Sequence, residues 1–221
     1  MYYIFFFATM LITLISQSYI NSTYQKTRKI LSKKGMSGRE VARRILDENG
    51  LKNVKVEEVS GTLSDHYDPK NKTVRLSTDI YQNTSLASVA VASHECGHAI
   101  QDKEGYSFLR IRNSIIPLVN IASRAGYIII VISFLMSLMK LLWVGILLEF
   151  VILAFQVITL PVEFNASNRA LKQIKDLKIV NDEEHVNCKG MLTAAALTYV
   201  ASVASAIIEI TRLLFILNRR R

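Results

Sequence analysis

The sequence has few cysteines and few histidines, the residues that form disulfides and commonly bind metals. It has two cysteines, Cys96 and Cys188, far apart among 221 residues, and only four histidines. The two cysteines need no disulfide, which argues against a disulfide-stapled fold and agrees with a reducing compartment. Four histidines leave few nitrogen ligands for a metal site.

A nucleic-acid-binding motif is also missing, although the formal net charge is +9. Half of the residues are apolar and a fifth are charged, which fits neither an ordinary soluble domain nor a protein lying wholly within the membrane. We interpret the positive charge as flanking charge that orients membrane segments and attracts anionic lipid. A lipid bilayer is therefore an expected partner, and nucleic acid is not.

The segment from Tyr2 to Ile20 carries no charge and is about long enough to span a bilayer. It lacks the basic start and the small-residue cleavage site of a secretory signal, so we predict a transmembrane anchor over residues 1–21. The basic residues that follow, with no acidic residue among them, are Lys26, Arg28, Lys29, Lys33 and Lys34. The positive-inside rule places this flank in the cytoplasm and the N-terminus outside.

Two further apolar stretches run from Ser114 to Met139 and from Leu141 to Leu160. Lys140 separates them and Trp143 lies close by, as expected for a tight turn at the far interface. We predict a transmembrane helical hairpin over residues 114–160.

Arg124 and Glu149 fall inside this hairpin. Charge within a membrane is costly and usually faces a bundle interior or an aqueous cavity, so we expect structural polar contacts for both. Counted from a turn at Lys140, Arg124 lies level with Gln156, which predicts no direct pair between Arg124 and Glu149.

The last apolar stretch, Met191 to Leu217, begins with small residues that let helices pack closely. It is followed by three arginines, residues 219–221, which a single crossing from the cytoplasm would put outside, against the usual bias. We expect its first half to pack against the part of the chain at residues 22–113 instead. Whether residues 191–221 span the membrane or pack is left open.

Between the anchor and the hairpin, Ser37-Gly38-Arg39-Glu40 has the form of a capping box and predicts a short amphipathic helix that stops at Asn49-Gly50. Residues 54–59 and 73–77 have the composition of strands, and residues 68–72 that of a turn. We expect a small sheet here. One of its strands either pairs with an extended substrate or serves structure alone.

Residues 84–101 predict a helix, because a serine or threonine cap precedes small and apolar residues. Within it, His94-Glu95-x-x-His98 places two imidazoles one turn apart on one face, where both reach a single metal ion. A catalytic zinc keeps one position open for water, and Glu95 would take the proton as that water attacks a carbonyl. The alternative is a chance match of five residues.

Two histidines leave a catalytic zinc one protein ligand short. The other histidines are His66 and His185, but Glu163 is the better candidate, because residues 163–167 resemble the second ligand helix of gluzincin-type peptidases in their Glu-x-x-Ala-polar form. That resemblance carries the choice. The two ligand segments can meet only if an even number of membrane crossings separates them, and the hairpin at 114–160 supplies two.

Nearly the whole chain resembles the YugP-type neutral zinc metallopeptidases of bacterial membranes. The runs that carry this resemblance are Asp65 to Pro69, Thr73 to Ser77, Ala92 to Gln101, Leu160 to Ser167 and Ala194 to Ala201. The resemblance implies a membrane-bound peptidase with a zinc cofactor, in which His94, His98 and Glu163 are metal ligands and Glu95 is the catalytic glutamate.

Other candidate residues have plainer interpretations. Members of the family commonly have an aliphatic residue in place of Cys96, which should point away from the metal because it is two residues from His94 on a helix. His66 is either structural or a hydrogen-bond donor to the reaction's oxyanion. His185 and Cys188 have a metal-like spacing, but two ligands make no site, so we expect a solvated connector there.

Polar residues near the third ligand have supporting roles in this interpretation. Arg169 is expected to form an ion pair with Asp102 or Glu104. Asn165 or Ser167 is expected to orient a ligand histidine, which zinc sites commonly require.

These patterns predict an α+β membrane protein, mostly helical, with a small sheet and a zincin-like helix. Its expected parts are an anchor at 1–21, a catalytic part at 22–113, a transmembrane hairpin at 114–160, a second ligand helix and loop at 161–190, and a hydrophobic helix at 191–221.

The expected reaction is hydrolysis of peptide bonds by a zinc-activated water at the cytoplasmic face of the cell membrane. Membrane tethering suggests substrates near the inner leaflet, such as misfolded membrane proteins or released peptides. The alternatives are a non-enzymatic membrane protein with a structural zinc, and a degenerate peptidase kept as a binding scaffold. The peptidase hypothesis and the structural-zinc hypothesis differ at Glu95, because a structural site needs no base.

Overall fold

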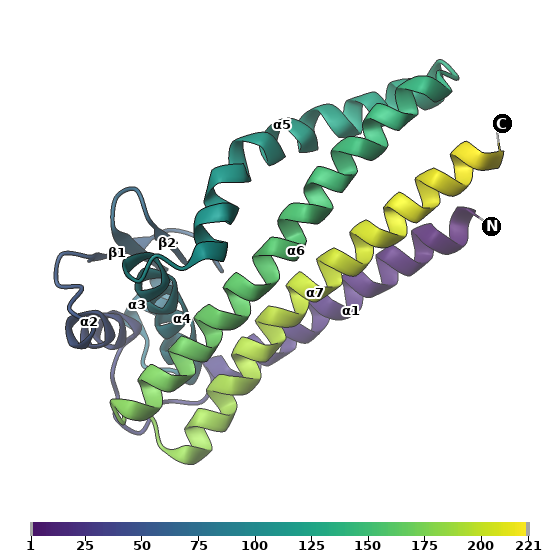
Figure 1. Ribbon diagram of the computed structural model, residues 1–221. Coiled ribbons are helices and arrows are strands. Elements are labelled where there is room, and N and C mark those ends of the chain that lie inside the picture. The colour runs from purple at the N-terminus through teal and green to yellow at the C-terminus, as the bar shows by residue number, and fades with distance from the viewer. Residues whose placement is uncertain (1, 220–221) are drawn as a thin grey trace. The chain divides into compact units, whose positions relative to one another are not determined.

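A computed structural model describes residues 2–219 and shows a mostly helical chain with one small sheet (Figure 1). Its helices are α1 (Tyr2–Arg28), α2 (Gly38–Glu48), α3 (Thr78–Gln82), α4 (Leu86–Lys103), α5 (Ser107–Leu135), α6 (Met139–Asp176) and α7 (Asp182–Arg219). Its strands are β1 (Lys55–Val59), β2 (His66–Asp68) and β3 (Thr73–Ser77).

The chain divides into two compact units, and the long helices α1, α6 and α7 contribute to both. The helical unit consists of the described parts of Met1–Gln17, Arg110–Pro161 and Leu197–Arg221. The mixed unit consists of Ser18–Leu109 and Val162–Ala196, and it contains the sheet. Each unit is therefore assembled from segments that are distant in sequence.

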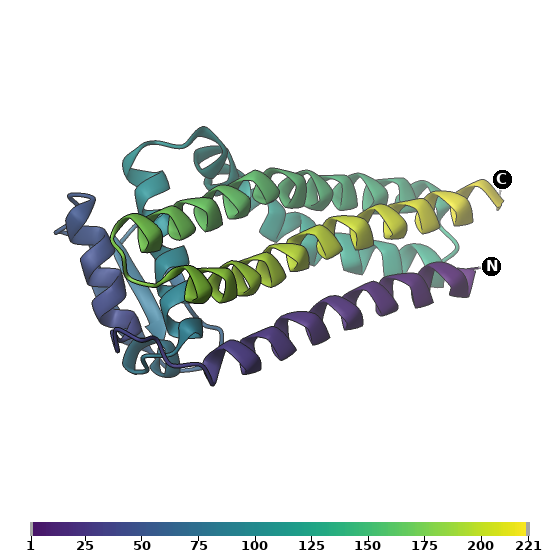
Figure 2. The ribbon, with the colours of Figure 1, turned by 90° about the horizontal axis from the view of Figure 1, so that it is seen from below.

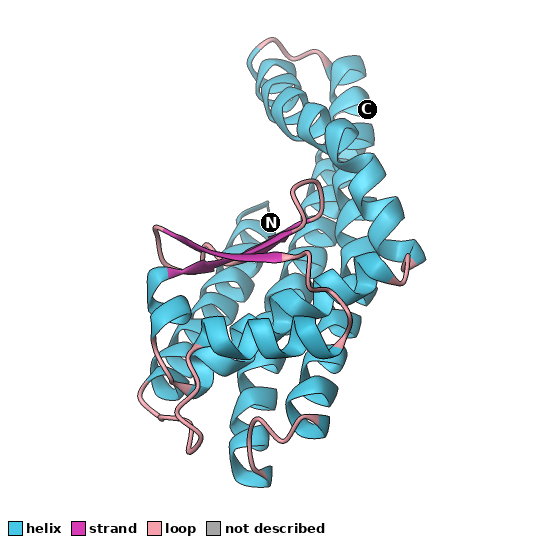
Figure 3. Ribbon diagram, turned by 90° about the vertical axis from the view of Figure 1, so that its left-hand side faces the viewer, coloured by secondary structure: helices cyan, strands magenta, loops and turns pink. Residues whose placement is uncertain are grey.

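The sheet of the mixed unit has the strand order β1-β3-β2 (Figure 3). β1 is parallel to β3 and β2 is antiparallel to it, so β2 is an edge strand. The predicted strands at 54–59 and 73–77 are confirmed as β1 and β3. The sequence analysis missed β2, because its three residues lead directly into the turn that starts at Asp68-Pro69.

Helix starts in the mixed unit follow the predicted capping chemistry. The Ser37 hydroxyl accepts a hydrogen bond from the Glu40 backbone N–H, and the Glu40 carboxylate accepts one from the Ser37 backbone N–H, which confirms the capping box of α2. Helix α4 begins after Ser85, whose hydroxyl accepts a hydrogen bond from the backbone N–H of Ser88. The predicted helix at 84–101 is thereby confirmed.

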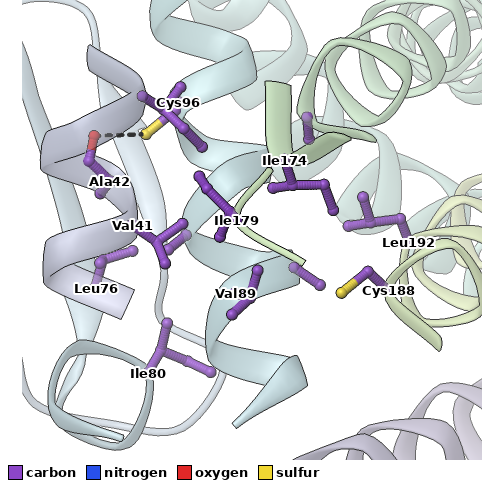
Figure 4. Packing of buried hydrophobic residues seen from close by; sticks show 14 of the residues in the cluster. Val41, Ala42, Leu76, Ile80, Val89, Cys96, Ile174, Ile179, Cys188 and Leu192 are labelled. Carbon is purple, nitrogen blue, oxygen red and sulfur yellow. Dashed lines mark hydrogen bonds between the residues drawn. The ribbon is translucent and has the colours of Figure 1, made fainter. Parts of the chain in front are cut away.

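The core of the mixed unit joins residues from before and after the predicted hairpin (Figure 4). Val41 from α2, Leu76 from β3 and Val89 from α4 pack in one buried cluster with Ile174 from α6 and Leu192 from α7. The chain must therefore return after residue 160 to complete this core.

The helical unit contains the α5–α6 hairpin, which Figure 2 shows as two helices joined by a short turn. The residues of the turn are 136–138. Gly145 lets the two helices approach, because a Cβ there would lie 2.5 Å from Cγ1 of Ile130 on α5. Helices α1, α5, α6 and α7 are each long and apolar enough to cross a membrane.

The two terminal helices lie side by side at their outer ends (Figures 1 and 2). The rings of Phe5 on α1 and Phe215 on α7 have centroids 6.2 Å apart within the helical unit. The first half of α7 contributes Met191 and Leu192 to the core of the mixed unit, as expected. Arg220 and Arg221 of the arginine run lie outside the described residues.

The predicted loop up to Gly190 is wrong, because α7 already begins at Asp182. A reciprocal cap explains this start. The Asn181 side chain accepts a hydrogen bond from the Glu184 backbone N–H at 2.8 Å, and the Glu184 carboxylate accepts one from the Asn181 backbone N–H at 2.9 Å. The expected separate helix after Pro161 is also wrong, since α6 continues through that proline.

The position of the hairpin turn changes which residue of α6 lies level with Arg124 on α5. Because the turn is centred on Ser137 and not on Lys140, Arg124 lies level with Glu149 and not with Gln156. The two still form no ion pair, as predicted. Arg124 is exposed and has no hydrogen bond or ion pair with the residues that the structure describes, so the polar contact expected for it inside a bundle is wrong.

Truncating Ile174 should destabilise the mixed unit, because this side chain is fully buried in its core. We expect Ile174→Ala to lower the free energy of unfolding by about 2–5 kcal/mol. The control Val186→Ala, at a position that is 69% exposed, should change it by less than about 0.5 kcal/mol. Chemical unfolding in detergent measures both, and equal losses would contradict this core.

Candidate metal centre

The predicted histidines lie on one face of α4 and point at the same atom. The rings of His94 and His98 have centroids 4.8 Å apart and are nearly perpendicular. Nε2 of His94 lies 3.2 Å, and Nε2 of His98 3.5 Å, from Oε2 of Glu163 on α6. The structure thus brings together the three residues proposed as ligands.

The arrangement fits a tetrahedral metal. The candidate ligand atoms of His94, His98 and Glu163 all lie within 4.8 Å of one another. Around a tetrahedral zinc with bonds of about 2.0–2.2 Å, neighbouring ligand atoms lie about 3.3–3.6 Å apart. The two nitrogen–oxygen distances, 3.2 and 3.5 Å, are close to that spacing. Two imidazoles and one carboxylate are also a ligand set that zinc accepts.

Glu163 remains ionised in spite of its burial. Only 2% of the residue is exposed, and burial alone would raise its pKa. Hydrogen bonds to His94 and His98 outweigh this effect and hold the pKa of Glu163 well below its usual range. The carboxylate therefore carries the negative charge that a metal ligand needs.

Glu95 is the second buried carboxyl of the site. Burial raises the pKa of Glu95 to about 7, while the charge of His94 and a hydrogen bond from the backbone of Tyr67 act in the opposite direction. Glu95 therefore exchanges protons near neutral pH. The contact with Tyr67 also places the edge strand β2 against this carboxyl.

Gln101 contacts the ring nitrogen of His98 that faces away from Glu163. Its Oε1 lies 3.0 Å from Nδ1 of His98, and its amide nitrogen donates to the carbonyl of Val162 and to Oδ1 of Asn165. The amide orientation makes Nδ1 the donor, which leaves Nε2 of His98 free to face Glu163. The sequence analysis missed Gln101, although a residue three positions after His98 shares its helix face.

Ser167 plays the matching role for His94, with its hydroxyl 3.2 Å from Nδ1 of that ring. This confirms the predicted partnership of Ser167 with a ligand histidine. Asn165 does not contact a histidine itself and instead acts through Gln101. Arg169 donates to Asn165 and forms an ion pair with Glu104 at 2.7 Å, one of the two partners predicted for it.

Gly97 sets how closely the two ligand helices approach. A Cβ at this position would lie 2.4 Å from the backbone oxygen of Ala166 on α6. Real Cβ atoms do not approach backbone that closely, so only glycine allows this contact. The residue sits between the two histidines in sequence and holds their helix against the helix of Glu163.

The remaining candidates lie elsewhere in the mixed unit. His66 is exposed on β2, with Nδ1 2.8 Å from the carbonyl of Ser64. Cys96 points away from the histidines, toward the carbonyl of Ala42 (Figure 4). This orientation is as predicted. Burial raises the pKa of its thiol, so Cys96 is an inert packing residue.

The expected solvated connector at His185 and Cys188 is wrong, because both residues are in α7. Cys188 is fully buried in the core and contacts the carbonyl of Leu86. His185 lies 3.2 Å from the carbonyl of Leu171. Neither residue belongs to the group that surrounds Glu163.

Comparison with known proteins agrees with this geometry. The profile of the family described as "Putative neutral zinc metallopeptidase" matches residues 2–218. The chain belongs to this family. It is 43% identical over 206 residues to the "Putative membrane protease YugP" of Bacillus subtilis (strain 168), which covers 93% of this chain and 92% of that protein. No solved structure matches. The resemblance to the neutral zinc metallopeptidases is thereby confirmed.

Gly97→Ala should separate the ligand helices and lower the zinc content of the purified protein, because the new methyl group collides with backbone and not with a flexible side chain. Gly190→Ala is the matched control, since a Cβ there meets nothing within 4 Å. Metal analysis of detergent-purified protein measures both variants. Full zinc occupancy in Gly97→Ala would show that the close contact is dispensable.

Proposed function

We propose that this chain is a membrane-bound zinc peptidase that hydrolyses peptide bonds. The observation that carries the proposal is the convergence of two imidazole nitrogens and one carboxylate oxygen beside a second, buried carboxyl. In this proposal His94, His98 and Glu163 hold the zinc ion and Glu95 is the catalytic residue. Zinc bound by three such ligands supplies a water whose pKa is lowered to about 7 and polarises the scissile carbonyl.

Glu95 moves the proton in this mechanism. Its carboxyl, buried beside the three proposed ligands, can accept a proton from the attacking water and return it to the leaving amine. Gln101 and Ser167 hold the two histidine rings with Nε2 toward Glu163, so the proposed ligands are ordered before substrate binds.

The edge strand β2 supports a role in binding extended peptides. It has a sheet partner, β3, on one side, and the backbone of Tyr67 contacts Glu95. A substrate strand that pairs with the other side of β2 would run past the catalytic carboxyl. His66, on the same strand, remains a proposed donor to the developing oxyanion.

A non-enzymatic protein with a structural zinc fits these features less well. Structural zinc sites usually take four protein ligands, whereas the group assembled here has three. A structural site also has no use for a buried carboxyl such as Glu95 beside its ligands. The presence of Glu95 speaks equally against a degenerate peptidase.

We propose four membrane crossings with the mixed unit in the cytoplasm. The chain enters the mixed unit along α1, leaves it along α5, returns along α6 and leaves again along α7. An even number of crossings then separates His98 from Glu163. The basic flank at residues 26–34 places this side inside.

Glu95→Gln should retain zinc and lose cleavage of a mixed peptide library by about 10²–10⁴-fold, because the variant keeps the ligands and removes the base. Glu48→Gln, an exposed glutamate at the end of α2, is the control and should cleave normally. Chelator should abolish wild-type cleavage. Undiminished cleavage in Glu95→Gln would reject the mechanism, and zinc without any cleavage in the wild type would favour the structural alternative.

The proposed orientation predicts where introduced cysteines react. Met136→Cys, in the hairpin turn, should be labelled by a membrane-impermeant maleimide in intact cells, whereas Lys52→Cys should react only after lysis. The native thiols Cys96 and Cys188 are both buried and add little background. The reverse labelling pattern would place the catalytic site outside the cell.

A further inference from the structure

The helical unit contains a polar cavity that the proposed peptidase chemistry does not use. Its volume is about 440 Å³, and α1, α6 and α7 line it. Much of its lining consists of hydroxyl, amide and carboxylate side chains, although the helices are apolar enough to span a bilayer. Polar groups in such segments usually face a partner or an aqueous space.

Each of the three helices presents a buried polar atom to this cavity without a hydrogen-bond partner among the described residues. These atoms are Oγ of Ser16, Oε1 of Gln156 and Oγ of Ser205. Leaving such atoms without a hydrogen bond in a membrane-spanning segment is energetically costly. The Gln156 oxygen is an acceptor, so the missing partner must bring hydrogen-bond donors.

The cavity also holds a carboxyl group that has no cationic partner among the described residues. Two glutamates line it. Glu209 forms an ion pair with Arg212 on its own helix, whereas Glu149 has no ion pair within the part of the chain that the structure describes. A donor-rich, positively charged group therefore complements the site.

Arg124 is such a group, and it lies at about the same depth as Glu149. Arg124 is exposed on α5 and has no ion pair among residues 2–219, and Arg124 and Glu149 are almost equally far from Ser137 at the hairpin turn. Both lie about 15–20 Å along their helices from that turn, near the middle of a hydrocarbon core about 30 Å thick. Each charge alone is costly there, and neither finds the other within one chain.

We propose that this cavity receives Arg124 of a second copy of the chain, inserted in the same membrane orientation. The guanidinium brings five N–H donors to Glu149, Gln156 and the serine hydroxyls. The interface would be heterologous, with α5 of one copy meeting α1, α6 and α7 of the next.

The shape of the cavity favours an arginine side chain over a small inorganic cation. A volume of about 440 Å³ equals that of roughly fifteen waters at about 30 Å³ each, far more than one dehydrated ion fills. Ile152, Ala201 and Ala206 also line it and suit the apolar stem of arginine. The small residues on α7 additionally allow close approach of another helix.

Self-association in liposomes tests this proposal. The full-length wild-type chain is labelled with one fluorophore, and its dissociation constant is measured by photobleaching-step counting over a range of protein-to-lipid ratios. We expect Arg124→Leu and Glu149→Leu each to weaken association by tenfold or more. The exchange variant with both Arg124→Glu and Glu149→Arg should recover most of the wild-type association.

Lys140→Leu is the control, because it removes an exposed charge near the turn and away from the cavity. Unchanged zinc content in every variant shows that the mixed unit has folded. A monomeric wild type, single variants without effect, or an exchange variant no better than the single ones would overturn the proposal. Loss in Glu149→Leu but not in Arg124→Leu would assign the cavity to another cation and would equally overturn it.

Discussion

The contact between the backbones of α4 and α6 at Gly97 is the constraint on which the site depends. It brings Glu163 to the two histidines although the ligand positions are 65 or more residues apart in sequence. Because α6 also forms half of the hairpin, the metal centre can be completed only by a chain that leaves the mixed unit and returns. In the proposed function, the number of membrane crossings and the assembly of the candidate metal centre therefore depend on each other.

The candidate ligands are held in place by hydrogen bonds between the same two helices, α4 and α6. Gln101 links His98 to two positions on α6, and Ser167 on α6 reaches His94. Both imidazoles thus keep Nε2 toward the buried carboxylate of Glu163. This outer layer also connects to the surface through Arg169 and Glu104, where the ion pair stabilises the end of α4.

Much of this arrangement is predictable from the sequence, because capping boxes and the spacing of His94 and His98 report local geometry. Tertiary details are less accessible. The edge strand β2 is not predictable from its composition, because turn residues follow it directly. The start of α7 is not predictable either, because the Asn181 cap has the composition of a loop. Pro161 does not end α6. The hairpin turn lies about three residues before its predicted position, so Glu149 and not Gln156 is level with Arg124. The role of Gln101 depends on contacts between α4 and α6, which the sequence alone does not specify.

X-ray absorption at the zinc edge of the purified protein tests the central claim most directly, because it reports the ligands themselves. The account predicts two imidazole nitrogens and carboxylate or water oxygens at about 2.0–2.2 Å, with no sulfur at about 2.3 Å. It also predicts that Glu163→Ala alters the oxygen shell while both imidazoles persist. A sulfur ligand, a single imidazole, or a spectrum that Glu163→Ala leaves unchanged would contradict it.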